Sequence, residues 1–232
     1  MPSSTFLTAE WSGLLGVTYA TDAALLEPHL PRGVEIDVLD GAPRVSLVAF
    51  RFRHTRVRGI AIPGHVNFPE INLRFYVRLD GERAVVFIRE FVPRRAIAWT
   101  AKIVYNEPYR RVPMREILRT GDQLEVRHRF GPQLGSSVHA WADPAGEQPL
   151  LDTPEHWLTN HGLGVGRARD GRARSYRVEH PLWGLHTVRN LRVDVDFAEL
   201  YGPEWAYLST AEPSHVTLAA GSDVLIYPAR DV

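Results

Sequence analysis

The chain has 232 residues, of which 44% are hydrophobic, and this length is sufficient to bury a sizeable core. Its 27 basic residues balance its 27 acidic ones, which excludes an overall attraction to nucleic acid or to an anionic membrane and leaves only local patches for polyanions. The absence of cysteine excludes disulfides, thiolate metal sites and thiol nucleophiles. Because the first residues lack the pattern of a signal peptide and no apolar run approaches the ~18 residues of a membrane span, we expect a soluble, cytoplasmic protein.

Alternating apolar and polar residues predict most of the secondary structure. Each of three Asp-Gly pairs predicts a two-residue β-hairpin: Asp40-Gly41, Asp80-Gly81 and Asp170-Gly171. Around the second pair, every other residue from Ile71 to Leu79 is apolar, and the apolar segment 84–88 returns, so the period is two rather than 3.6. Segments 45–52 and 123–130 also have the pattern of strands. We therefore predict a mainly β, mostly antiparallel fold in a single domain over residues 1–232.

Helix signals are few and short. Thr153 and Pro154 are residue types preferred at the start of a helix. With Gly162 as the stop, they predict a helix from Pro154 to His161. Two further short helices are expected, one between residues 21 and 31 and one over 196–201. None is long enough to organise the fold, so we expect the sheet to determine the architecture.

Standard catalytic signatures are missing from the chain. It contains no Walker loop, no Gly-x-Ser-x-Gly elbow and no His-Glu-x-x-His. The glycine-spaced run 162–166 follows a helix stop and leads into a hairpin, whereas a dinucleotide-binding loop follows a strand and opens a helix. His156 and His161 are five residues apart, a spacing that places them on different faces of a helix. We therefore predict no cofactor and no metal.

The segment from Ile88 to Arg95 carries a glutamate, a proline and two adjacent arginines at the end of an apolar strand. An arginine stays protonated and presents a planar fork of donors, so it can hold a carboxylate or phosphate but cannot act as an amine nucleophile. In an extended strand Arg94 and Arg95 point to opposite faces, so only one of them can enter an interior. Glu90 is the expected partner of the inward arginine.

Other charged residues complete the candidate site. Arg74 lies on the polar face of the predicted strand 71–79, whereas Arg51 shares the apolar face of the predicted strand 45–52. If the protein is an enzyme, the candidate acid–base groups are Glu70, Glu90 and His65.

Lys102 is the only lysine among the 27 basic residues, so a Schiff-base mechanism would have to use it. Such a nucleophile needs desolvation or a neighbouring cation to lower its pKa.

Two patterns carry a resemblance to a known superfamily. Segment 18–37, and Arg89-Glu90 followed by Pro93-Arg94-Arg95, are similar to the entry segment and to the Arg-Glu, then Pro-Lys-Lys, motif of acetoacetate decarboxylases. More closely, the chain from about Phe6 to Pro228 resembles the uncharacterised bacterial YqjF-like family. The supporting stretches are 45–52, 72–74, 86–90, 105–109, 180–183 and 221–224.

This resemblance implies a closed antiparallel β-barrel of the acetoacetate decarboxylase-like type, with a small cavity and assembly as a homo-oligomer. In the decarboxylases the first motif lysine forms an imine with the substrate and its neighbour lowers its pKa. Arg94 and Arg95 occupy those places here. Imine-dependent decarboxylation is therefore not expected at Pro93-Arg94-Arg95. Glu70 falls near the position of a pocket carboxylate in the superfamily.

Three functional hypotheses remain open. In the first, the barrel binds a small carboxylate or other anion in an interior pocket, and it has no nucleic-acid or membrane partner. Its candidate ligand-binding residues are Arg94, Arg95, Glu90, Arg74 and Arg51. In the second, the protein is a non-catalytic structural or interaction barrel with a packed interior, where Glu90 and an arginine form a structural ion pair. In the third, it is a lyase or decarboxylase that uses Lys102.

Overall fold

The computed structural model describes residues 5–94, 108–168 and 170–232. The strands are β1 (Leu7–Ala20), β2 (Glu35–Ile36), β3 (Val38–Leu39), β4 (Ala42–Val57), β5 (Phe68–Leu79), β6 (Glu82–Val92), β7 (Tyr109–Arg111), β8 (Met114–Thr120), β9 (Leu124–Phe130), β10 (Ser136–Glu147), β11 (Leu163–Arg167), β12 (Ala173–Glu179), β13 (Leu185–Asp194), β14 (His215–Ile226) and β15 (Arg230–Asp231). The helices are α1 (Ala23–Leu26), α3 (Pro154–Thr159) and α4 (Phe197–Tyr201), with 3-10 turns η1 (Glu27–His29), η2 (Pro132–Leu134) and η3 (Pro203–Ser209). The protein is mainly β, as the sequence pattern predicts.

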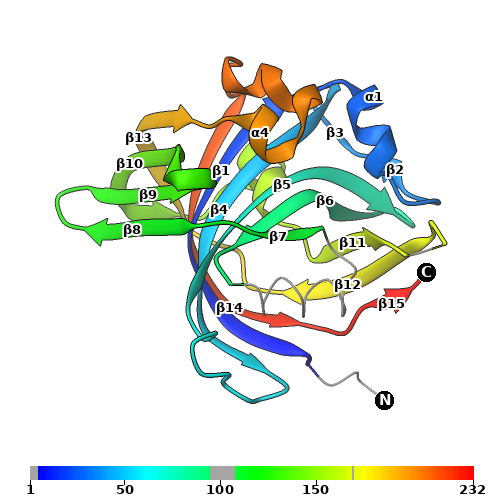
Figure 1. The fold of residues 1–232 in the computed structure, drawn as a ribbon, viewed down its shortest axis with the longest axis horizontal. Helices are drawn as coiled ribbons and strands as arrows, with labels where there is room; N and C mark the ends of the chain where they lie inside the picture. The colour runs from blue at the N-terminus through cyan, green and yellow to red at the C-terminus, as the bar shows by residue number, and fades with distance from the viewer. Residues whose placement is uncertain (1–4, 95–107, 169) are drawn as a thin grey trace.

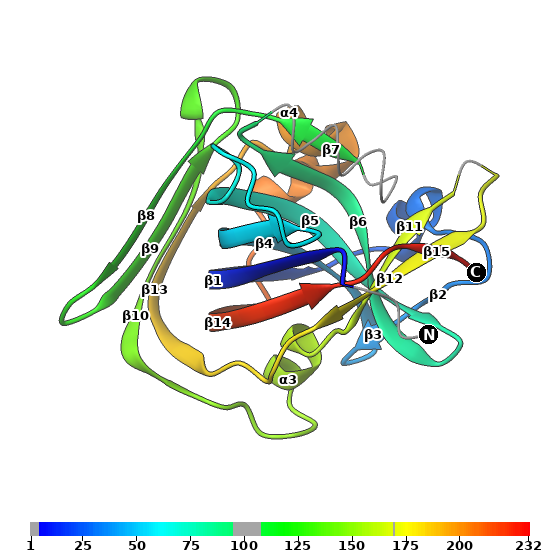
Figure 2. The same ribbon diagram turned by 90° about the horizontal axis from the view of Figure 1, so that it is seen from below.

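The strand pairings form a ring with an extension. Neighbouring strands follow the order β12-β11-β6-β5-β4-β1-β14, and β12 also pairs with β14, through Val178 opposite Ile226. From β14 the sheet continues through β13, β10 and β9 to β8, which together form a wall beside the ring strands in Figure 2. Most pairs are antiparallel, but β6 pairs in parallel with β7 and with β11.

The central strands of the ring are buried on both faces. On β5, Ile71, Leu73 and Phe75 belong to the main hydrophobic core, which also contains side chains from β9 and β10. The intervening Asn72 is also buried, on the opposite face. Strands with two buried faces have nearly continuous runs of buried residues. The extension therefore covers the outer face of the ring. The inner face, which carries Asn72, lines the interior of the ring.

Short helical segments close one end of the main core. Phe197 and Tyr201 of α4 and Trp205 and Leu208 of η3 are all buried in it. Figure 1 shows α4 beside the ends of the long strands. No helix within the described ranges is long and apolar enough to cross a lipid bilayer.

Two of the three predicted hairpin turns are confirmed. Asp40-Gly41 and Asp80-Gly81 adopt positive φ angles, and each connects a directly paired strand ladder. Asn, Asp and Gly tolerate this conformation best. The third prediction is wrong in loop length. Arg167 and Ala173 form the closing pair of β11 and β12, so five residues rather than two connect the strands, and within this connection the Ala168 amide donates to the Arg172 carbonyl oxygen.

The short helices form where they are predicted, with shorter extents. Helix α3 begins at Pro154, and the Thr153 Oγ1 accepts a hydrogen bond from the His156 amide. It ends at Thr159, two residues before the predicted end, and His161 follows outside the helix. Because His161 lies outside the helix, helical periodicity does not determine where its side chain points.

Candidate functional site

A cavity of about 130 Å³ lies within the ring of strands. One water molecule needs on the order of 10–15 Å³ of such space, so the cavity has room for a small organic molecule. Side chains from β1, β4, β5, β6, β11, β12 and β14 line it, together with Tyr109 of β7 and residues next to α3. The lining has an aromatic part and a polar part.

The polar part is built on three neighbouring strands. Glu70, Asn72 and Arg74 occupy alternate positions on β5, and all three line the cavity. The β5–β6 register places Glu90 opposite Asn72, and β7 places Tyr109 beside Glu90. Two carboxyl groups, an amide, a phenol and a guanidinium thus converge from segments that are far apart in the sequence.

A β-bulge in β6 aims Glu90 into the cavity. The register shifts between the pairs Leu73–Arg89 and Arg74–Phe87, which leaves Ile88 as the extra residue. Before the bulge Phe87 lines the cavity and Ile88 lies in the main core; after it, Glu90 lines the cavity. A bulge changes which face successive side chains occupy. Simple alternation along the sequence would have placed Ile88 and Glu90 on the same face.

Burial makes Glu70 easy to protonate. The Tyr109 hydroxyl donates to Glu70 Oε2 at 3.0 Å, and Asn72 Nδ2 donates to Glu70 Oε1 at 3.4 Å. Desolvation raises the pKa of Glu70 to about 7, although these hydrogen bonds and the charge of Arg74 oppose the rise. Burial, followed by the charges of Glu70 and Glu90, raises the pKa of Tyr109, which therefore stays a hydrogen-bond donor. Glu70 is suited to accept or give a proton near neutral pH.

Arg74 and His161 both line the cavity beside the ring of Tyr76. The Arg74 Cζ lies 5.8 Å from the centroid of the Tyr76 ring, and its Nε is buried without a hydrogen-bond partner among the described residues. His161 packs against the rings of Tyr76 and Trp157, with centroid distances of 4.9 and 5.7 Å. Burial and then the charge of Arg74 hold the pKa of His161 well below its usual value, so the ring is neutral. A neutral imidazole offers one donor and one acceptor.

Both ring nitrogens of His161 are buried, and neither has a hydrogen-bond partner within the described part of the chain. The sequence pattern suggests this residue only as half of a metal pair and does not predict its place in the cavity. Its position depends on where α3 ends and on the parallel contact of β11 with β6, at Gly164 opposite Val85. No local sequence signal encodes either feature.

The aromatic part occupies the other end of the cavity. Trp11 lies edge-on to Phe50 and Phe52, at centroid distances of 5.1 and 5.7 Å, and Phe52 stacks on Phe68 at 4.7 Å. Trp183 lies 6.1 Å from Trp11. These rings come from β1, β4, β5 and the segment before β13, and together they form an apolar wall.

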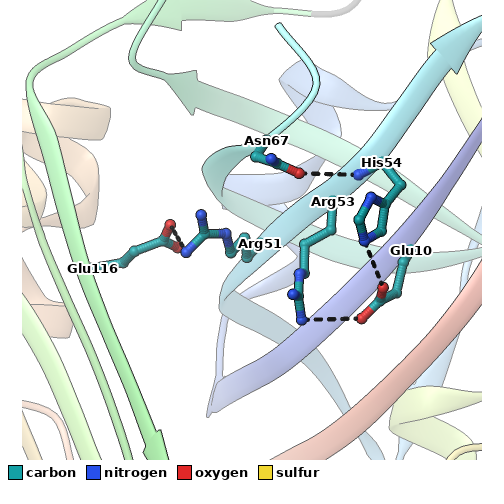
Figure 3. Close-up of polar contacts among 6 residues, drawn as sticks. All are labelled: Glu10, Arg51, Arg53, His54, Asn67 and Glu116. Carbon is teal, nitrogen blue, oxygen red and sulfur yellow. Dashed lines mark hydrogen bonds and ion pairs between the residues drawn. The ribbon is translucent and has the colours of Figure 1, made fainter. Parts of the chain in front are cut away.

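Three other candidate residues lie away from the cavity lining. Arg51 is on the main-core side of β4, and its Nη1 lies 2.9 Å from Oε1 of Glu116 on β8 (Figure 3). His65 is in the β4–β5 loop, where its Nδ1 lies 3.0 Å from the Pro63 carbonyl oxygen. Arg94 follows the end of β6 and is exposed. Two further candidates, Arg95 and Lys102, lie outside the described residues.

Figure 3 also shows that Arg53 and His54, near the end of β4, lie beside Glu10. Arg53 Nη1 lies 3.4 Å from Glu10 Oε1, and His54 Nε2 lies 3.6 Å from Glu10 Oε2. Among the described residues that line the cavity, Arg74 is the arginine. Within the described ranges, no group of three or more His, Asp or Glu side chains could hold a metal ion.

Comparison with solved structures defines the class of fold. Acetoacetate decarboxylase from Legionella pneumophila aligns over 100% of this chain and 88% of its own, with 14% identity and a TM-score of 0.65. The enduracididine biosynthesis enzyme MppR complexed with pyruvate aligns over 100% of this chain and 91% of its own, with 12% identity and a TM-score of 0.63. At these identities the likeness establishes the acetoacetate decarboxylase-like fold alone.

Sequence comparison identifies the family. The pattern of the DUF2071 family, described as an uncharacterized conserved protein, matches residues 8–223, and the chain belongs to this family. It is 26% identical over 153 residues to the uncharacterized protein YqjF of Bacillus subtilis (strain 168). That alignment spans 64% of this chain and 62% of YqjF. The expected YqjF-like membership is thus confirmed.

Proposed function

We propose that the protein binds a small molecule with a carboxylate or similar anionic group in the cavity of the ring, and that Arg74 holds this group. The observation that carries the proposal is the state of Arg74. Its Nε is buried at the cavity without a hydrogen-bond partner, and no carboxylate of the described residues forms an ion pair with it. A buried guanidinium N–H without a hydrogen-bond partner is unfavourable, and a carboxylate bound in the cavity would accept a hydrogen bond from it.

Two further observations support binding over a packed interior. The cavity of about 130 Å³ is open space between a polar part and an aromatic wall, whereas a structural barrel would fill it. A structural neighbour binds pyruvate, a small carboxylate. We also propose that the ring is a closed barrel, because β12 pairs with β14. We further propose that each chain forms a single domain and that the protein is a cytoplasmic homo-oligomer.

If the protein catalyses a reaction, we assign proton transfer to Glu70. The Tyr109 hydroxyl, which donates to Glu70, holds the Glu70 carboxyl group in place, and Glu90 lies beside Tyr109 in the strand register. Imine formation at Pro93-Arg94-Arg95 has no part in this proposal. Arg94 is exposed, and an arginine is a poor nucleophile. The proposed site is therefore centred on β5, not on the arginine pair.

The test compares ligands and variants. Thermal shift and calorimetry would measure the binding of butyrate and of its neutral analogue butyramide to the wild type and to Arg74→Met. We expect butyrate to stabilise the wild type, butyramide to have no effect, and Arg74→Met to lose at least about tenfold in affinity for butyrate. The control is Arg51→Met, which removes an arginine paired with Glu116 outside the cavity. Equal butyrate affinity in wild type and Arg74→Met would refute the assignment.

A further inference from the structure

We infer that the preferred ligand is an aromatic carboxylic acid with a hydrogen-bond acceptor on its ring. Its carboxylate lies at Arg74 and its ring lies against Trp11. This inference rests on the proposed function, because it names the other end of the molecule whose anionic group Arg74 holds.

The strand register gives the cavity two chemically different ends. On β5 the alternate residues that line the cavity run from Phe68 through Glu70 and Asn72 to Arg74. Phe68 pairs with Phe52 of β4. Six residues at ~3.3 Å each separate the Cα atoms of Phe68 and Arg74 by about 20 Å, and their side chains reach into the space between. A ligand that is held by Arg74 and extends along β5 therefore points its far end towards the aromatic wall.

The aromatic wall has the geometry of a ring-binding site. Trp11 contacts Phe50 and Phe52 edge-on and Trp183 at a tilt, all with centroids between 5.1 and 6.1 Å apart. Aromatic pairs favour these separations and orientations over face-to-face contact. Because these side chains line open space, a flat ring entering it can make further contacts of the same kind.

The Trp11 indole supplies the second argument. Its Nε1 is buried and has no hydrogen-bond partner among the described residues, whereas the Trp183 Nε1 donates to Ser222 Oγ at 2.9 Å. An indole N–H can only donate, so its partner must be an acceptor. A hydroxyl or ether oxygen on the ligand ring would satisfy it. Plain core packing explains the other rings but leaves this N–H desolvated without compensation.

The first experiment needs no variant. Calorimetry would measure the affinity of the wild type for phenylacetate, cyclohexylacetate, butyrate and 4-hydroxyphenylacetate. We expect phenylacetate to bind about tenfold tighter than cyclohexylacetate, which has similar size but no aromatic ring. We expect 4-hydroxyphenylacetate to bind tightest. If butyrate and cyclohexylacetate bind as well as the two aromatic acids, the inference fails while the proposed carboxylate site stands. If none of the four binds, both fail.

The second experiment isolates the indole N–H. Trp11→Phe keeps an aromatic ring but removes the donor, so it should weaken 4-hydroxyphenylacetate about fivefold more than it weakens phenylacetate. Trp183→Phe is the matched control, because its N–H is already bonded to Ser222. An equal loss for both acids in Trp11→Phe would overturn the role of the N–H. Thermal unfolding of each variant establishes that it is folded before binding is compared.

Discussion

Glu70 is only 4% exposed, so ionising it places a charge where water cannot solvate it. The hydrogen bonds from Tyr109 and Asn72 reduce this penalty without removing it, and the pKa stays at about 7. The sequence predicted Glu70 as a site residue from its order along the chain, and the structure places it in the cavity with Glu90 and Arg74. The titration behaviour was not predictable, because it depends on burial in the folded ring and on a hydrogen bond from Tyr109 of β7.

The raised pKa predicts a pH-dependent cost to stability. Between its ordinary value of 4.5 and about 7, the folded state binds more protons at Glu70 than the unfolded state, so stability falls as pH rises through this window. Glu70→Gln removes this loss. We expect the variant to be more stable than the wild type at about pH 8, by on the order of 3 kcal/mol, and similar to it at about pH 4. Urea denaturation across this range measures the difference; a constant difference at every pH would contradict the assignment.

His128 makes the opposite contribution. It lies on β9 and is 3% exposed, and burial together with the charge of Arg51 lowers its pKa from 6.5 to about 4. The folded state therefore binds fewer protons here, and the stability that His128 contributes above pH 6.5 is lost as the pH falls towards 4.

Replacing His128 with leucine should remove this acid sensitivity. We expect His128→Leu to keep on the order of 3 kcal/mol that the wild type loses between about pH 7 and pH 4. His54→Asn serves as the control, because His54 is exposed and asparagine tolerates its positive φ. If both variants follow the wild-type pH profile of urea denaturation, His128 is not a titrating element of stability.

Elements show where local sequence determines structure and where it does not. The Asp80-Gly81 turn follows from residue chemistry alone, and the structure confirms it. The start of α3 likewise follows from the Thr153 cap. The bulge at Ile88 has no comparable local signal, because the partner strand determines where the extra residue lies. This explains why the β6 residues that enter the cavity could not be identified by alternation.

Two glycines with similar φ angles test how much the close approach of β1 and β14 contributes to stability. Gly221 has a φ of +90° and a Cβ there would lie 2.0 Å from the Trp11 carbonyl oxygen, whereas Gly81 has a φ of +81° and nothing within 4 Å. Gly81→Ala should cost about 1 kcal/mol of unfolding free energy, from backbone strain alone. Gly221→Ala should cost at least about 3 kcal/mol, because β1 and β14 must separate.

Chemical denaturation of both variants measures these costs. Equal destabilisation would mean that the close approach of β1 and β14 contributes nothing beyond the strain of the left-handed conformation.

At the scale of the whole molecule, we expect the least stable part to be the end of the sheet. Strands β4 and β5 are paired along both edges and have two buried faces. Strand β8 is the last strand of the extension, pairs with β9 and has an exposed or half-exposed side chain at every position. Edge strands with few buried contacts open most readily.

Hydrogen exchange should therefore follow this arrangement. We expect the amides of 71–79 to exchange at least about a hundredfold more slowly than those of 114–120, as measured by mass spectrometry of peptides from the native protein. Equal rates in the two segments would indicate that the ring and the extension open together as one unit. Adding phenylacetate should slow the ring amides further and leave those of 114–120 unchanged.

The two buried faces of β5 have a consequence for how this protein can change over evolutionary time. Positions 71, 73 and 75 face the core, while 70, 72 and 74 face the cavity. Point substitutions at the second set can therefore change the lining of the cavity without repacking the core, so the chemistry of the cavity can diverge while the fold persists. A single-residue deletion in this strand would exchange the two sets and destroy both properties at once. Descendants of one ancestral sequence are thus free to substitute residues here but not to change the length of the strand.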